Sequence, residues 1–151
     1  VYKRQPEHGT YQNILRENVF TVSFPTADAV VLASLAASPR CDDHSKPSLD
    51  ALPRFSATTI DGEFLRQSTL FFECELDRIV DDFGANSLIA GRIVSAMMSA
   101  AAQRSMDLDD QEVVAASPLL AYLAPGRYAT IDRSQSFPFP KGFQRTKDPE
   151  P

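Results

Sequence analysis

A histidine, a glycine and a threonine in succession form the first candidate binding motif of the chain. They are His8, Gly9 and Thr10, and the amphipathic stretch YQNILRE follows them. A hydroxyl followed by a helical turn can offer its side chain and free backbone N–H groups to a phosphate. The alternatives are that Thr10 is a helix N-cap and that His8 is simply solvated. We take the three residues as candidate ligands of a phosphate-bearing cofactor.

Two expected turns carry the remaining candidates. Asn86 lies in the stretch DDFGANS, and its amide can donate or accept a hydrogen bond but cannot carry a proton near neutral pH. Asparagine is also common in turns for purely conformational reasons. Arg127 and Tyr128 follow a Pro-Gly pair and can reach a ligand or a partner subunit, with core packing as the alternative.

The patterns that suggest a metal ion are incomplete. The stretch CDDH, which begins at Cys41, supplies one cysteine and one histidine, and a tetrahedral site needs a second pair. Asp107, Asp109 and Asp110 resemble the start of a calcium loop, but no glycine or closing glutamate follows at the required spacing. We expect no metal site. Cys41 and Cys74 are the only cysteines, which favours a reduced, cytoplasmic setting over a disulfide framework.

Composition limits the function classes. The chain has 151 residues, enough for one domain, with 43% hydrophobic and 23% charged residues, as in globular proteins. The formal net charge of -5 argues against nucleic-acid binding, which needs clustered Lys and Arg. No window contains the roughly 18 or more apolar residues of a membrane span. We therefore expect neither a nucleic-acid partner nor a membrane partner.

The first regular elements are a strand and a helix. Phe20, Val22 and Phe24 alternate with polar residues, which predicts a half-buried strand that ends at Pro25. A helix is predicted over residues 27–37, with Thr26 as its N-cap and a stop before Pro39. Residues 40–65 are expected to be irregular, apart from one short helix in the stretch SLDALPRF and a turn at Asp61-Gly62.

A long antiparallel hairpin is the clearest expectation. Its first strand places Leu70, Phe72, Cys74 and Leu76 on one face and Glu73, Glu75 and Asp77 on the other. This alternation predicts one dry face and one wet face, with the glutamates in water. The second strand covers residues 88–98. Within it, Gly91 predicts a bulge or a place where another group approaches the backbone closely.

The last third of the chain predicts a short helix and a second hairpin. Residues 106–116 begin with aspartates and end apolar, as in a helix with favourable charge at its N-terminus. Residues 118–131 predict strand, Pro-Gly turn and strand. The proline-broken tail beyond Arg133 is expected to lie on the surface with its phenylalanines tucked down. The predicted fold class is therefore mainly β, antiparallel, with flanking helices, and closure into a barrel would remove the sheet edges.

Three stretches resemble flavin reductases of the FMN-binding split-barrel family. They are HGTYQNILRENVFTVSFPT, STLFFECELDRIVDDFGANSLIAGRIVSA and SPLLAYLAPGRYATI. Together they cover most of residues 7–131 in the family's order. The resemblance implies a six-stranded antiparallel barrel with flanking helices, a homodimer, and a flavin near the subunit boundary. It also implies hydride transfer from NAD(P)H to FMN, with FAD as the alternative flavin.

The chain departs from the family pattern at two places. Gly84-Ala85-Asn86 stands where the family has Gly-Asp-His, and Ser23 replaces the Asn after Phe-x-Val. The family's His is associated with the nicotinamide side, so its replacement by Asn86 puts nicotinamide use in doubt. By the resemblance, Asn86 is the candidate catalytic residue, and His8, Gly9, Thr10 and Tyr128 are the candidate flavin ligands.

The beginning of the chain suggests an artefact. Read as the codons GTG TAT AAG AGA CAG, residues 1–5 match a transposase mosaic end used in preparing sequencing libraries, with an ordinary frayed terminus as the alternative. We therefore expect an adapter segment at 1–5, a partial flavin reductase-like domain at 6–133, and a tail at 134–151. The family's flavin-cradling elements lie mostly before the Thr-Tyr segment, so this fragment is expected to be inactive and to bind FMN weakly.

Two functions of different classes remain open. The first is a flavin-dependent oxidoreductase of the NAD(P)H:flavin reductase type in the intact parent protein. The second is a non-catalytic flavin-binding or interaction module on the same scaffold, which the loss of the histidine favours. Fold alone does not decide between them.

Overall fold

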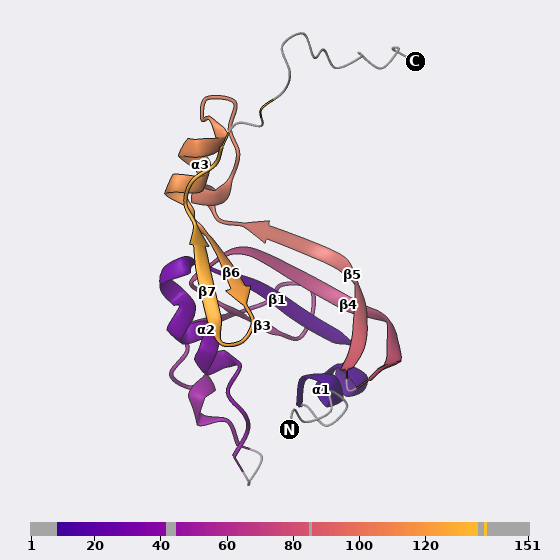
Figure 1. The fold of residues 1–151 in the computed structure, drawn as a ribbon. Helices are drawn as coiled ribbons and strands as arrows, with labels where there is room; N and C mark the ends of the chain where they lie inside the picture. Colours follow the sequence, from indigo (N-terminus) through magenta and orange to yellow (C-terminus); the bar gives the residue numbers. More distant parts are fainter. Residues whose placement is uncertain (1–8, 42–44, 85, 136–137, 139–151) are drawn as a thin grey trace, which may run out of the picture.

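The computed structural model describes residues 9–41, 45–84, 86–135 and 138. The expected adapter segment, His8, the residues Asp42 to His44 of the CDDH stretch, and most of the tail lie outside the described residues. The chain is mainly antiparallel β-structure with flanking helices, as expected (Figure 1).

The N-terminal half contains α1 (Gly9–Glu17), β1 (Val19–Pro25), η2 (Ala27–Ala29), α2 (Val30–Ala36), η3 (Pro47–Leu49), β2 (Arg54–Ser56) and β3 (Glu63–Leu65). The C-terminal half contains β4 (Ser68–Phe83), β5 (Asn86–Met98), η4 (Ala100–Ala102), α3 (Asp110–Ala116), β6 (Leu119–Leu123) and β7 (Arg127–Ile131).

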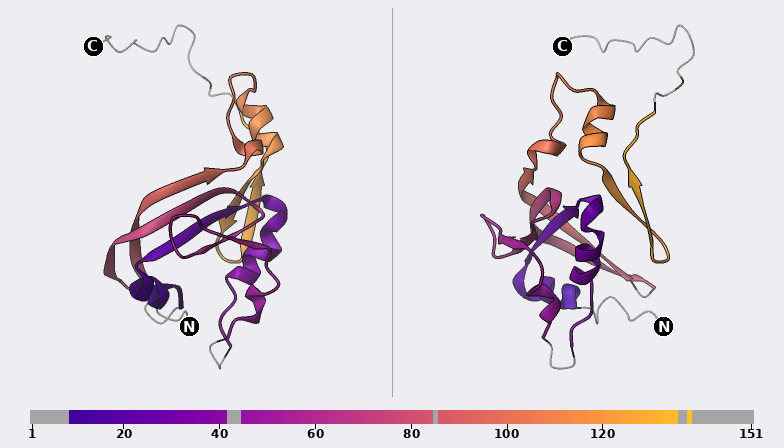
Figure 2. Two further views of the ribbon diagram at one scale, coloured as in Figure 1. Left: turned by 180° about the vertical axis from the view of Figure 1, so that it is seen from behind. Right: turned by 90° about the vertical axis from the view of Figure 1, so that its left-hand side faces the viewer.

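Three sheets make up the β-structure of the described residues. The largest is antiparallel with strand order β1-β4-β5, and β2-β3 and β6-β7 form two-stranded sheets. The right-hand view of Figure 2 shows the β2–β3 segment and the β6–β7 hairpin on opposite sides of the large sheet. The sheet therefore has a back face, which β2–β3 covers, and a front face, which is turned toward the β6–β7 hairpin.

Most local predictions agree with the structure. The strand before Pro25, the long hairpin and the Pro-Gly hairpin are present as β1, β4–β5 and β6–β7. The aspartate-led helix is α3, and Asp109 caps it in a capping box with Glu112: each side chain accepts a hydrogen bond from the other residue's backbone N–H, both at 2.9 Å. In place of the short helix expected in SLDALPRF, the chain forms the 3-10 helix η3, which overlaps that stretch only at Ser48 and Leu49, and the stretch ends in β2.

Thr26 stands at the N-cap position of η2, as predicted, and its carbonyl oxygen accepts a hydrogen bond from the Ala29 N–H at 3.0 Å. Its side chain makes no capping hydrogen bond, and the helix expected over residues 27–37 is split into η2 and α2. Thr26 instead bonds the carbonyl oxygen of Gln67, through its N–H at 3.1 Å and its hydroxyl at 3.4 Å. The threonine is used to tie the end of β1 to the residue before β4, a tertiary partner that local sequence does not reveal.

The prediction that Glu73 meets water was wrong. Glu73 is only 1% exposed. One carboxylate oxygen, Oε1, accepts from the N–H and the hydroxyl of Thr58, at 3.0 and 2.9 Å, and Oε2 accepts from the N–H groups of Thr59 and Ile60, at 2.7 and 3.1 Å. The backbone N–H of Thr58 is the largest cause that lowers the pKa of Glu73 from 4.5 to about 2, against the opposing effect of burial.

The back face is dry because residues 54–65 fold across it. Phe55, Phe64 and Phe71 pack with ring centroids 5.3 Å apart, and Phe64 is 1% exposed. The edge of this segment is held to β1, where the Thr21 hydroxyl donates to the Glu63 carbonyl at 2.7 Å. The Leu65 N–H donates to the Ser23 hydroxyl at 3.1 Å. The face predicted to be wet therefore contains much of the core.

The front face, predicted to be dry, is only partly so. Cys74 is buried, at 3% exposed, but Phe24 and Met98 are 43% and 53% exposed. Antiparallel pairing aligns Phe24, Leu70 and Met98 in one row. The alternation correctly separated the two faces of the sheet. It did not show which of the two faces is covered by another segment of the chain.

The close approach predicted at Gly91 is confirmed. A Cβ atom built there would lie 2.4 Å from Cζ of Phe20 and 3.2 Å from Cβ of Cys74. Gly91 pairs with Leu76 next to a register shift in the ladder. The ring of Phe20 thus crosses from β1 to β5 over the space that a side chain at position 91 would fill.

Replacing Glu73 by Gln is expected to destabilise the fold, because an amide presents one donor to a cluster of four donors. We expect the Tm near pH 7 to fall by about 5 °C or more. The folded-state pKa lies below the ordinary value, so the carboxylate stabilises the fold above about pH 4.5 and loses this effect as the pH falls toward 2. The difference between wild type and Glu73→Gln should therefore shrink in acid, as measured by thermal unfolding from about pH 7 to 3.

Glu75→Gln is the matched control for that experiment. Glu75 lies on the same strand and pairs with Arg92 at 2.6 Å, with side chains 46% and 74% exposed. Such a surface pair contributes about 0–1 kcal/mol. Equal effects of the two substitutions would contradict the role assigned to Glu73.

Gly91→Ala is expected to destabilise the protein by about 1–3 kcal/mol, because the new methyl group overlaps the Phe20 ring. At an open glycine with ordinary backbone angles the same change would stabilise by about 0.4–1 kcal/mol. The sign of the change in unfolding free energy, measured by urea unfolding, therefore tells whether the space beside Gly91 is occupied. In a Phe20→Leu background the cost of Gly91→Ala should fall, and an unchanged cost would mean that Phe20 is not the obstacle.

Candidate functional site

One carboxylate joins the first turn of α1 to the β4–β5 turn. The Tyr11 hydroxyl lies 3.2 Å from both Oδ1 and Oδ2 of Asp81, and the Ser87 hydroxyl donates to Oδ1 at 2.6 Å. Tyr11 is 9% exposed. Desolvation, and after it the hydrogen bond and charge of Asp81, raises the pKa of Tyr11 above its usual value. Residues 70 positions apart in sequence thus become neighbours.

This contact connects the two elements that carry three of the residues predicted from the sequence. Gly9 and Thr10 begin α1, directly before Tyr11, and both are exposed. Asn86 begins β5, directly before Ser87, and is also exposed. The structure therefore places the candidate phosphate-binding turn and the candidate catalytic asparagine on two elements that Asp81 connects.

The remaining candidates are elsewhere or outside the described residues. His8 lies outside them. Tyr128 is on β7 and 55% exposed, and Figures 1 and 2 show the β6–β7 hairpin well separated from α1. Arg127, at the start of the same strand, is exposed as well. Core packing, the alternative for Tyr128, is not what the described residues show.

The N-terminus of α1 is a positively polarised position. Its first turn contains no acidic residue, and the free N–H groups of a helix start carry partial positive charge. A Cβ atom at Gly9 would lie 3.2 Å from Nε of Arg40, so a guanidinium group stands beside this turn. The combination suits an anion such as a phosphate.

A second cation lies near Arg40. The Lys46 ammonium group donates to the carbonyl oxygen of Ala36 at 2.6 Å, at the end of α2. Desolvation, and then the charge of Arg40, lowers the pKa of Lys46 below its usual value. Sequence reasoning missed both residues, because they lie in the irregular segment after α2, where no periodic pattern indicates a partner.

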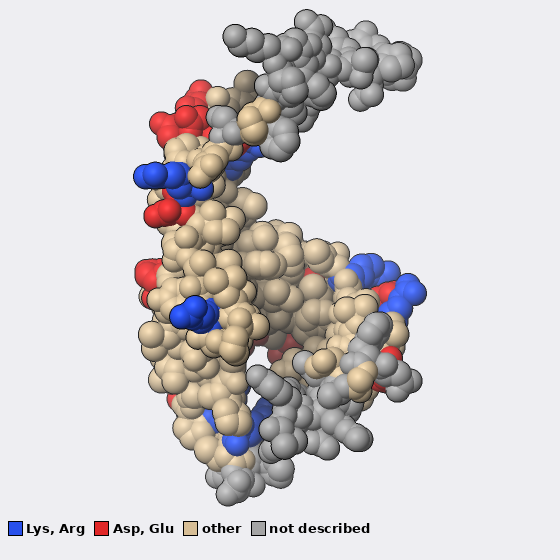
Figure 3. Space-filling view, viewed as in Figure 1, with Lys and Arg blue, Asp and Glu red and all other residues tan. Residues whose placement is uncertain are grey.

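Figure 3 shows a hollow between the β6–β7 side of the molecule and the end of the β4–β5 hairpin. It lies over the front face of the large sheet, where Phe24, Ile93 and Met98 are 43%, 52% and 53% exposed. The Phe24 ring meets that of Phe72 edge to face, with centroids 5.3 Å apart. The hollow thus has an apolar, partly aromatic wall, which suits a planar ring or another apolar surface.

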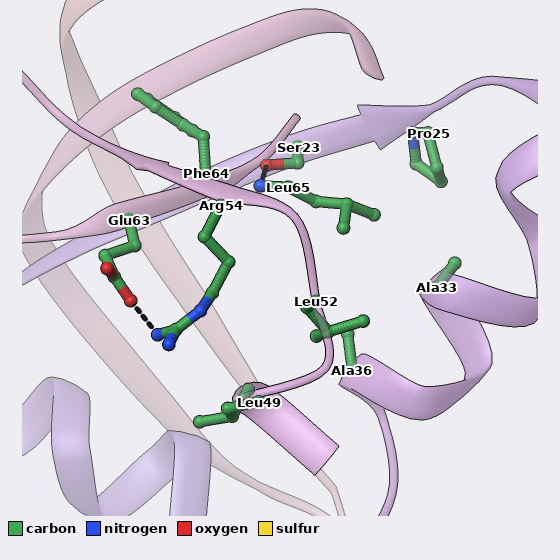
Figure 4. A pocket seen from close by; sticks show the side chains of 10 residues that line it. All are labelled: Ser23, Pro25, Ala33, Ala36, Leu49, Leu52, Arg54, Glu63, Phe64 and Leu65. Atoms are coloured by element: carbon green, nitrogen blue, oxygen red, sulfur yellow. Dashed lines mark hydrogen bonds and ion pairs between the residues drawn. The ribbon is translucent and has the colours of Figure 1, made fainter. Parts of the chain in front are cut away.

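A separate cavity of about 310 Å³ opens between α2, η3 and the β2–β3 hairpin (Figure 4). It is lined mainly by Ala, Leu, Pro and Phe side chains, and its two charged residues, Arg54 and Glu63, pair with each other. Neither Asn86, Gly9, Thr10 nor Tyr128 lines it. This cavity is therefore not the place where the sequence-predicted residues meet.

The described part of the chain contains neither a cluster suited to a metal ion nor a membrane-spanning helix. No group of three or more His, Cys, Asp or Glu residues is placed to hold a metal ion there. None of the helices described has the length and apolar character needed to cross a membrane.

The fold is shared with several solved structures of low sequence identity. Flavoredoxin of Desulfovibrio vulgaris (Miyazaki F) aligns with a TM-score of 0.69 at 18% identity, over 92% of this chain and 73% of that one. Nitrilotriacetate monooxygenase component B from Bacillus cereus aligns with a TM-score of 0.69 at 17% identity, over 89% of this chain and 68% of that one. The 2-nitrobenzoate 2-nitroreductase of Pseudomonas fluorescens aligns with a TM-score of 0.66 at 21% identity, over 90% of this chain and 66% of that one. This chain thus spans about two thirds to three quarters of their lengths.

The sequence itself identifies the family. No curated protein sequence matches this chain. The sequence model of the flavin reductase like domain, in contrast, matches residues 3–131, which is most of the chain. The split-barrel fold, the order of the strands and this match agree, so the chain belongs to the flavin reductase like domain family.

Proposed function

We propose that this chain binds FMN and takes part in flavin-dependent oxidoreduction, with NAD(P)H as the electron donor in the whole protein. The observation that carries the proposal is a pair of contacts at the start of α1: the Arg40 guanidinium lies beside Gly9, and Asp81 joins Tyr11 to Ser87 at the start of β5. The family of the chain and the fold it shares with a flavoredoxin support the same reaction class.

The residues present fit the two chemical parts of a flavin nucleotide. The phosphate end suits the first turn of α1, where exposed Thr10 supplies a hydroxyl and Arg40 a guanidinium near Gly9. The planar ring suits the part of the apolar front face nearer to this turn, where Ile93 is 52% exposed. FAD, with a second phosphate, is the alternative nucleotide.

In this proposal the protein binds and orients the flavin, and the flavin carries out the chemistry. Flavin, when bound, supplies the hydride and electron chemistry. The chain's own part is to hold the phosphate at Thr10 and Arg40, to exclude water with the apolar wall, and to present the Asn86 amide from the β4–β5 turn. Asn86 can donate or accept a hydrogen bond there but does not exchange a proton near neutral pH.

A non-catalytic flavin-binding module is the second candidate. It is favoured by the same residue, because Asn86 stands where a proton-carrying histidine would be expected in a nicotinamide-using relative. A solved relative is itself described as an FMN-binding protein, from Thermus thermophilus, with a TM-score of 0.67 at 21% identity, over 88% of this chain and 69% of that one. The two candidates share flavin binding and differ in whether electrons arrive from NAD(P)H.

Further parts of the proposal concern the whole protein. Exposed apolar side chains of β5, including Leu88, Ile93 and Met97, suit burial against a second copy, so we propose a homodimer. A reducing, cytoplasmic location is proposed from the sparse cysteines.

The test compares the 151-residue chain with a version extended at its N-terminus by the native upstream coding sequence. We expect the extended protein to purify with flavin bound and its flavin absorbance to bleach when NADH or NADPH is added without oxygen. Retained flavin without bleaching would overturn the reductase in favour of the module. The 151-residue chain should retain FMN weakly, and tight retention through gel filtration would contradict its being partial.

In the extended protein, Arg40→Gln is expected to weaken FMN binding about 10- to 100-fold, because a charge-assisted bond to the phosphate is lost. Arg66→Gln is the matched control, since Arg66 lies over the Phe55 ring at 5.5 Å on the β2–β3 segment. Fluorescence titration of FMN measures both. Equal dissociation constants for wild type and Arg40→Gln would remove Arg40 from the phosphate site.

A further inference from the structure

We infer that Asp81 is a positioning residue, which sets the spacing between the first turn of α1 and Asn86 by accepting hydrogen bonds from Tyr11 and Ser87 at once. The inference rests on the proposed function, because it assigns to this spacing the affinity for the flavin nucleotide. Asp81 is not proposed to touch the flavin. Its effect passes through the two hydroxyl groups and the backbone beside them.

The backbone ladder is irregular at the place where Asp81 acts. Pairing of β4 with β5 passes from Val80↔Leu88 directly to Phe83↔Asn86, with a shift of register between these pairs. The bond between the Ser87 hydroxyl and Asp81 Oδ1, at 2.6 Å, bridges this irregular step. The side-chain hydrogen bond thus restrains the β4–β5 turn at the point where regular backbone pairing is interrupted.

The same carboxylate also holds α1. The Tyr11 hydroxyl lies 3.2 Å from each carboxylate oxygen, a centred position between two acceptors. Tyr11 and Ile14 are the buried residues of α1, so Tyr11 is packed and its ring orientation is restricted. A packed ring with a tethered hydroxyl transmits the position of Asp81 to the helix start more rigidly than an exposed side chain would.

Both bonds end next to candidate ligands. Thr10 precedes Tyr11 and Asn86 precedes Ser87, so each tethered residue is one peptide bond from a candidate site residue. Hydrogen bonds to an ionised carboxylate are stronger than those between neutral groups. Loss of Asp81 should therefore loosen both sides of the proposed site together.

The experiment uses the extended protein with Asp81→Ala, Asp81→Asn and, in case these fold poorly, the milder Ser87→Ala. We expect Asp81→Ala to weaken FMN binding about tenfold. Amide hydrogen exchange in residues 9–17 and in the β4–β5 turn should rise in the same variant. Asp77→Asn is the control, because exposed Asp77 on β4 pairs with Arg78 at 2.6 Å and neither binding nor exchange should change.

A double substitution distinguishes positioning from general destabilisation. If Asp81 acts through its two hydroxyl partners, Asp81→Ala should weaken FMN binding no further in a Tyr11→Phe/Ser87→Ala background. Additive losses would overturn the inference, as would wild-type affinity and exchange in Asp81→Ala. If the wild type binds no FMN, the proposed function fails, and amide hydrogen exchange alone tests the role of Asp81. Unchanged protection of α1 in Asp81→Ala would then overturn the inference that Asp81 holds α1. Reduced protection of α1 in this variant would support it.

Discussion

The buried carboxylate of Glu73 is the interaction that organises the rest of the structure. A charge can be buried only when hydrogen bonds replace its water, and here three consecutive backbone N–H groups and one hydroxyl do so. To supply them, residues 58–60 must lie against β4, which draws the β2–β3 segment across the back face. The aromatic cluster around Phe64 follows from that placement.

Covering the back face leaves the front face for binding. Because residues 54–65 cover the back face, the row of Phe24, Leu70 and Met98 is left on the front face. Gly91 contributes by its lack of a side chain, which lets the Phe20 ring cross from β1 to β5. The shape of the proposed ring-binding wall is thus a consequence of core packing on the opposite face.

Two of the carboxylates of β4, Glu73 and Asp81, have different physical roles. Glu73 accepts mainly backbone donors in the dry interior, so it holds a chain segment. Asp81 accepts two side-chain hydroxyls at the exposed end of the hairpin, so it relates one element to another. One scaffold can host many functions, so differences in activity between proteins of this fold arise from site residues rather than from the scaffold.

Local sequence determined most elements of this protein, because two-residue alternation, turn residues and the Asp109 capping box act within a few positions. It did not reveal β2 and β3, which lie in the segment 40–65 that was expected to be irregular. It also predicted a bulge or a close approach at Gly91, and its motifs carried the resemblance to the family. The tertiary structure alone decided that Glu73 is buried, that the Thr26 side chain bonds Gln67 instead of capping a helix, and that Arg40 and Asp81 stand beside the candidate residues. The physical reason is distance along the chain: alternation distinguishes two faces of a strand, but only a segment folding back from elsewhere decides which face loses its water.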